Sequence, residues 1–199
     1  MKTLSALLLF VLATSSKLAA GEEDPALRAA IAEHTKEVRA RQEPMALELE
    51  AMVGDGTRLV LFSLDPNEDE RWSFNGKKNG IDVLRGFPIR GRATVTDKKE
   101  VHEIIRSLVA SLRESDGMVA SCFSPHHGLT IECGEKKIDL VICFTCFEGL
   151  AFGASTSTQY LVTDTPLTVF NAALARHKLP LPEEKPNQSS QPTPLKRRG

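Results

Sequence analysis

GLTIECGEKKIDLVICF, residues 128–144, carries the clearest β-strand signal in this chain of 199 residues. Its two arms, residues 128–133 and 136–144, are rich in β-branched and apolar side chains, which pack well on a half-buried sheet. Gly134 and Glu135 separate the arms, and a two-residue link that contains glycine is typical of a tight turn. The pattern predicts an antiparallel hairpin.

Helices and further strands are predicted on both sides of this hairpin. The clearest helix covers residues 97–112, where apolar side chains recur every three or four positions behind a polar capping residue. Since the chain groups its strands instead of alternating them with helices, we expect an α+β fold with a mostly antiparallel sheet and helices packed on it. A single domain should extend over residues 24–179. Helices are predicted over residues 26–42, with residues 45–52 as a candidate extension after Pro44, and over residues 97–112 and 167–177. The other strands are predicted over residues 58–64, 81–95, 150–152 and 159–163.

The two ends of the chain differ in composition from this domain. Residues 4–14, LSALLLFVLAT, form an apolar run that is as long as the central part of a secretory signal peptide and short for a membrane span. We therefore expect residues 1–20 to be a signal peptide and the protein to be exported by a bacterium, into the periplasm or the medium. Residues 180–199 are rich in Pro, Ser, Gln and charged side chains, a composition that predicts a disordered tail.

The charge balance argues against two classes of partner. The chain has 25 Lys and Arg against 26 Asp and Glu, and a formal net charge of -1 at pH 7. This balance offers no basic surface for a nucleic acid and none for an acidic membrane surface. We expect no membrane association once the signal peptide has been removed, and the sequence points to no particular partner.

Cysteine and histidine residues gather between positions 122 and 146. Three thiolates and one imidazole form a ligand set that Zn²⁺ accepts with tetrahedral geometry. The four groups would reach one ion if the turn at residues 122–128 folds back onto the end of the second hairpin arm. A zinc ion with four protein ligands is structural rather than catalytic. The candidate ligands are Cys122, His127 (or His126), Cys143 and Cys146.

Disulfide bonds are the main alternative, because an exported protein meets oxidising conditions and the number of cysteines is even. Pairing Cys122 with Cys133 and Cys143 with Cys146 would give the shortest loops. A bond between Cys143 and Cys146 could be redox-active. The pair follows a predicted strand, however, whereas redox Cys-x-x-Cys pairs usually open a helix. In a third interpretation the cysteines are ordinary buried residues.

A nucleophilic enzyme is the least favoured interpretation. Cys122 or Cys143 could pair with His127, and Asp139 or Asp164 could orient the imidazole. Such triads are recognised by geometry and not by the presence of the residue types, and the sequence shows no oxyanion-hole signature. We expect that the protein is not an enzyme.

One motif pair resembles a known pattern. Cys-Phe-x-Pro-x-His-Gly at residues 122–128, followed by a hairpin that ends in Cys-Phe-x-Cys at residues 143–146, is similar to a motif of uncharacterised exported bacterial proteins. The resemblance extends over residues 57–150 and implies export and a small domain, without an activity. It marks three cysteines and one histidine, and this favours a metal or redox site over two structural disulfides. The marked residues are Cys122, Pro125, His127, Gly128, Cys143 and Cys146.

The sequence thus predicts an exported small domain of unknown function with a Cys/His cluster. A structural Cys₃His zinc site is the first interpretation of that cluster. The alternative is a thiol–disulfide redox protein or a disulfide-stapled binding protein.

Overall fold

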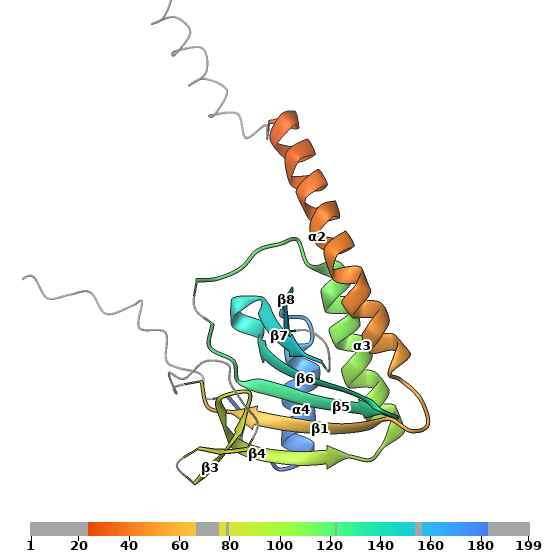
Figure 1. Ribbon diagram of the computed structural model, residues 1–199. Helices are drawn as coiled ribbons and strands as arrows, with labels where there is room; N and C mark the ends of the chain where they lie inside the picture. Colours follow the sequence, from red (N-terminus) through yellow and green to blue (C-terminus); the bar gives the residue numbers. More distant parts are fainter. Residues whose placement is uncertain (1–23, 67–75, 79, 122, 154–156, 183–199) are drawn as a thin grey trace, which may run out of the picture.

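One antiparallel sheet with helices packed on it makes up the domain, as predicted (Figure 1). The computed structural model describes residues 24–66, 76–78, 80–121, 123–153 and 157–182. The predicted signal peptide and most of the predicted tail lie outside the described residues, so both stay predictions.

The sheet of the described residues has eight strands in the order β2-β3-β4-β1-β5-β6-β7-β8, with every pairing antiparallel. Strands that follow one another in the chain are neighbours in the sheet, with the exception of β1, which lies between β4 and β5. The predicted hairpin is confirmed as β5 and β6, with Leu129 opposite Leu140 in the register. The strands are β1 Arg58–Leu64, β2 Gly76–Lys78, β3 Ile81–Leu84, β4 Phe87–Val95, β5 His127–Cys133, β6 Lys136–Cys143, β7 Glu148–Phe152 and β8 Ser157–Leu161.

The predicted bent strand over residues 81–95 is in fact two strands, β3 and β4. They are joined by Arg85 and Gly86, whose φ angles are 50° and 90°. A two-residue link with positive φ at both positions matches the twist of the flanking strands, which is why such turns are common in hairpins. Glycine adopts this conformation readily, whereas arginine does so at a cost in backbone strain.

The helices cover one face of the sheet (Figure 1). They are α2 Pro25–Ala51, α3 Lys98–Glu114 and α4 Leu167–Arg176. Asp24 caps α2 and Asp97 caps α3, each through a side-chain oxygen that accepts a backbone N–H. α2 continues through Pro44, because the residues that follow the proline are buried and their packing outweighs the hydrogen bond that proline cannot make. The buried residues of this second half of α2 are Met45, Ala46 and Leu49.

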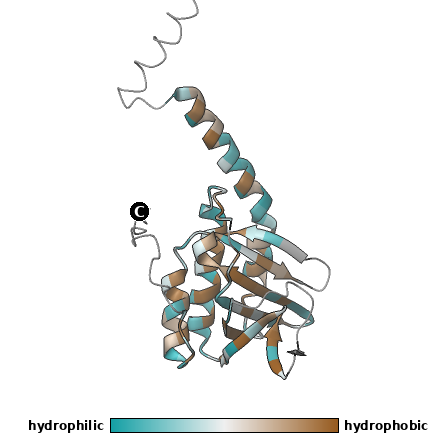
Figure 2. Ribbon diagram, turned by 90° about the vertical axis from the view of Figure 1, so that its left-hand side faces the viewer, coloured by the Kyte–Doolittle hydropathy of each residue, from teal (hydrophilic) through white to brown (hydrophobic). Residues whose placement is uncertain are grey.

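The main core lies between the helices and this face of the sheet. Each fully buried aliphatic side chain there stabilises the fold by roughly 1.5–3 kcal/mol. Figure 2 shows the hydrophobic colouring concentrated on the strands, with a mixed pattern along α2. Central members of the core are Leu59, Leu61, Ile104, Ile105, Leu108, Leu129, Leu140 and Phe170.

A smaller cluster lies on the opposite face, where alternate residues of the same strands point. It is built around Phe62 and Val141, and the β3–β4 hairpin folds over it with Leu84 and Phe87. Gly128 allows this close approach, since a Cβ there would lie 2.5 Å from Leu84 Cδ2. This second face carries charged groups at its centre, described below.

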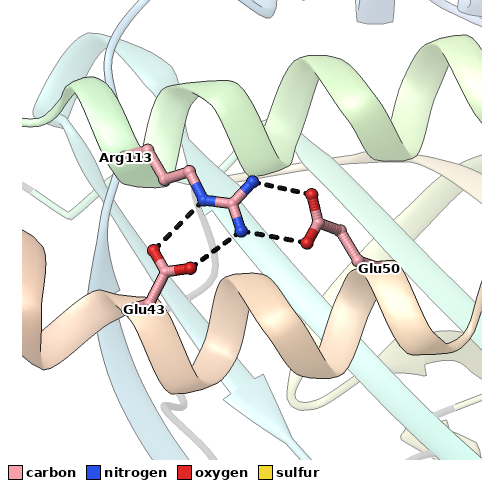
Figure 3. Close-up of polar contacts among 3 residues, drawn as sticks. All are labelled: Glu43, Glu50 and Arg113. Atoms are coloured by element: carbon pink, nitrogen blue, oxygen red, sulfur yellow. Dashed lines mark hydrogen bonds and ion pairs between the residues drawn. The ribbon is translucent and has the colours of Figure 1, made fainter.

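Arg113 of α3 links this helix to α2 through ion pairs with two glutamates (Figure 3). Its guanidinium binds both oxygens of Glu43 and both oxygens of Glu50, at 2.6–3.1 Å. These hydrogen bonds lower the pKa of both carboxyl groups and raise the pKa of Arg113. The first part of α2, residues 24–34, is exposed and extends beyond the sheet (Figure 1).

Candidate functional site

The Cys143 and Cys146 pair lies at the turn between β6 and β7. Cys143 is the last residue of β6, and the short 3₁₀ turn η2, Phe144–Cys146, follows it immediately. The two sulfur atoms form a disulfide, with the Cα atoms 5.2 Å apart. The cysteines are 1% and 0% exposed. The disulfide therefore links the two ends of this turn and is buried inside the protein.

Backbone hydrogen bonds tie this turn to two other segments. The N–H of Ala120 donates to the carbonyl of Cys146 at 3.1 Å, and the N–H of Val162 donates to the carbonyl of Phe147 at 3.0 Å. Phe147 has a φ of 59°, a left-handed conformation that a large side chain adopts rarely. The turn thus binds two other parts of the chain through its backbone, the segment before β5 at Ala120 and the residue after β8, Val162.

His127 is buried on the helix-covered face, at the start of β5. Its Nε2 atom lies 2.9 Å from Oδ1 of Asn171 in α4, and its ring packs edge-to-face against Phe144 and Phe170. Burial lowers the pKa of His127 to about 4, against the opposing effect of the Asn171 hydrogen bond. The imidazole is therefore neutral at pH 7 and packed as part of the core.

His127 and Cys143 point to opposite faces of the sheet. His127 is in register with Ile142, and side chains of successive strand residues point to opposite faces, so Cys143 faces away from the imidazole. Cys122 lies outside the described residues. In the part of the chain that the structure describes, no three His, Cys, Asp or Glu side chains are placed to hold a metal ion. Of the predicted zinc ligands, Cys143 and Cys146 form a disulfide, and His127 is hydrogen-bonded to Asn171.

Cys133 is a free thiol at the end of β5, half-buried against the core. It therefore does not form the disulfide with Cys122 that the alternative interpretation included. The two arms of the β5–β6 hairpin run antiparallel, which places Cys133 and Cys143 at opposite ends of it.

Asp139, considered above as an orienting group for a catalytic histidine, has other partners. It lies at the centre of the second sheet face and is 0% exposed. Thr130 donates a hydrogen bond to it at 2.6 Å, and Arg85 binds it through Nη2 at 2.8 Å and Nε at 3.0 Å. The Arg85 guanidinium also lies over the ring of Phe152, 4.7 Å from its centroid. Asp139 thus belongs to a buried ion pair on the face opposite His127.

Sequence reasoning missed Arg85 and Asn171 as partners of these groups. The adjacent residues Arg85 and Gly86 between two β-prone segments were the available signal for a tight turn, and a tight turn would have placed the arginine at a hairpin tip. Asn171 carried no signal, because it is a polar residue within the predicted last helix and only the packing of α4 brings it to His127.

Within the described ranges, no helix has both the length and the hydropathy needed to cross a bilayer. Comparison of the chain with protein-family models, with curated proteins and with solved structures found no match.

Proposed function

We propose that this chain is an exported, non-catalytic domain in which the Cys143–Cys146 disulfide acts as a structural staple of the β6–β7 turn. The observation that carries the proposal is the burial of both cysteines, at 1% and 0% exposure. A thiol–disulfide oxidoreductase needs a sulfur atom that its substrate can reach. A buried disulfide at the turn between β6 and β7 is suited instead to fixing the backbone conformation of that turn.

The surroundings of His127 support a non-catalytic role. A general base must lie within hydrogen-bonding reach of the proton that it removes. The Nε2 atom of His127 is bound to Asn171, and the ring is enclosed by two phenylalanines. The imidazole is suited to fixing α4 against β5.

Export rests on the apolar run at residues 4–14, and a disulfide agrees with that location. Disulfides persist in oxidising compartments and are rare in the reducing cytosol. The buried staple and the signal peptide therefore support each other as parts of one proposal.

A structural zinc site is the rival proposal. It rests on the motif resemblance, which marks Cys122, His127, Cys143 and Cys146. It requires Cys143 and Cys146 to be thiolates in the exported protein, because a disulfide sulfur is no longer available as an anionic ligand. The redox state of this pair therefore separates the two proposals.

Peptide mapping of the periplasmically expressed protein determines the redox state of Cys143 and Cys146. Lys137 and Arg176 bound a tryptic fragment, residues 138–176, that contains Cys143 and Cys146 and no other cysteine. The staple predicts that, in unfolded but unreduced protein, this fragment resists alkylation and takes up two alkyl groups after reduction. The zinc site predicts alkylation without reduction and about one equivalent of zinc, lost in Cys143→Ser.

Cys133→Ser is the matched control, since Cys133 is free and lies at the other end of the hairpin. It should change neither the alkylation of fragment 138–176 nor the metal content. Fully alkylated cysteines in that fragment before reduction, with or without zinc, would contradict the proposed staple.

A further inference from the structure

A side chain of α2 closes part of the sheet edge at β8. Nε2 of Gln42 donates to the carbonyl of Leu161, and Oε1 of Gln42 accepts the N–H of Leu161, both at 2.8 Å. Gln42 is only 6% exposed. A residue of a neighbouring strand would make this same pair of bonds. Gln42 therefore takes the place of an added strand at one residue of the edge.

These two bonds also show which backbone groups of β8 point outward. Leu161 directs its N–H and C=O toward Gln42 and away from β7. In an antiparallel pair, successive residues alternate between bonding the neighbouring strand and facing away from it. Gln159, two residues earlier and opposite Leu150, therefore also directs its N–H and C=O outward. No residue of the described part of the chain bonds to these two groups.

A hollow of about 280 Å³ lies beside this edge, lined from α2 by Val38, Arg41 and Gln42 and from β8 by Gln159 and Leu161. Arg41 is exposed and makes no ion pair with any described residue, unlike Arg113 on the neighbouring helix. The Gln159 side chain donates a hydrogen bond to Glu148. The hollow thus joins open backbone groups to the exposed guanidinium of Arg41.

We propose that the β8 edge binds an extended peptide segment by strand addition, and that Arg41 selects a segment with a carboxylate side chain. Outward N–H and C=O groups recognise an extended main chain, and pockets beside the edge read its side chains. Gln42 limits the pairing, because it already occupies Leu161. The bound segment is therefore short. This proposal goes beyond the role of the disulfide and does not depend on it.

Fluorescence anisotropy with defined peptides tests the proposal on the purified exported protein. The probes are labelled peptides of about six residues, the usual strand length, with alternating Thr and Val and one Glu moved through the sequence. Matching peptides carry Lys in place of Glu, and a third set is N-methylated at alternate residues. We expect binding of at least one Glu peptide, binding of the Lys peptides weaker by about tenfold, and no binding of the N-methylated set.

Two variants locate the binding on the β8 edge. Gln159→Pro removes the outward N–H and leaves the bonds to β7 intact, and edge strands tolerate proline at such positions. It should weaken binding at least about tenfold, whereas Gln159→Ala keeps the N–H and should bind as the wild type does. Arg41→Glu should reverse the preference between the Glu and Lys peptides.

Several outcomes would overturn the proposal. They are the absence of binding across the peptide panel, binding that ignores both Arg41→Glu and N-methylation, and concentration-dependent self-association that Gln159→Pro abolishes. The last outcome would assign the edge to a second copy of the chain. The N-methylated peptides keep the test decisive if Gln159→Pro does not fold.

Discussion

Arg85 and Asp139 form a salt bridge of 2.8 Å between a hairpin tip and the centre of the sheet, with the Asp139 side chain fully buried. Arg85 reaches Asp139 from a left-handed backbone conformation, with a φ of 50°. Thr130 satisfies the other carboxylate oxygen. The β3–β4 hairpin is therefore held over the second sheet face by a charge pair as well as by apolar packing.

Removing one partner of this pair should be costly. Arg85→Leu leaves the Asp139 carboxylate buried without its cation, and the free energy of unfolding should fall by about 3 kcal/mol in urea denaturation. The double variant Arg85→Leu with Asp139→Leu should recover part of that loss, because apolar residues can replace a buried ion pair. Arg92→Ala is the control, since Arg92 meets Asp82 at the surface at 3.7 Å and should cost less than about 1 kcal/mol. Equal losses for Arg85→Leu and Arg92→Ala would contradict the assignment.

Acid should destabilise the protein through His127. Burial lowers its pKa from 6.5 to about 4, so between these values the unfolded chain binds a proton that the folded chain does not. Stability falls as the pH drops through this window, by up to about 3 kcal/mol in total. His127→Gln should remove this contribution, and urea denaturation at pH 7, 5 and 4 would show it. An NMR titration of the His127 ring with a midpoint near 6.5 would refute the argument.

Tyr160 presents a buried hydroxyl that finds no hydrogen-bond partner within the described residues. Burial raises the pKa of this phenol. An unsatisfied buried hydroxyl costs roughly 1–3 kcal/mol. Tyr160→Phe keeps the ring and should leave the free energy of unfolding unchanged or raise it by about 1 kcal/mol. A loss of 1 kcal/mol or more in thermal or urea denaturation would show that the hydroxyl is satisfied.

Gly149 should not tolerate a side chain. A Cβ at this position would lie 2.2 Å from Cζ of Tyr160, whose ring fills the space above the glycine in the core. Gly149→Ala should lower the free energy of unfolding by about 2 kcal/mol or more. In a Tyr160→Ala background the added methyl should cost much less, since the ring is gone. Gly56→Ala, with no atom near its Cβ, is the control and should be close to neutral.

Local patterns predicted the elements of the fold well, and the reasons can be seen in particular residues. The helix over 97–112 appears as α3 with Asp97 as its cap, because capping and a 3.6-residue apolar period act within the segment itself. The β5–β6 hairpin appears for the same reason, since Gly134 takes the positive φ that its tight turn requires. The prediction over residues 81–95 was wrong in part, because the tight turn at Arg85 and Gly86 was taken for a bend in one strand.

The candidate site was less predictable than the fold. Cys143 and Cys146 were identified from their spacing, and the disulfide that was the alternative to a zinc site is present between them. The zinc site with Cys122 and His127 stays a proposal. The partners Arg85 and Asn171 were not identified, because each lies more than 40 positions along the chain from the residue that it contacts.

The sequence by itself determined the α+β class, the β5–β6 hairpin and the position of most helices and strands, since these follow from interactions between residues a few positions apart. The tertiary structure decided what the chemical groups do. It placed Asn171 beside His127, Arg85 beside Asp139 and Gln42 against Leu161, pairs separated by 44, 54 and 119 positions. Contacts at such distances depend on how helices pack on a sheet and on which face each strand residue points to, and no local pattern specifies that packing.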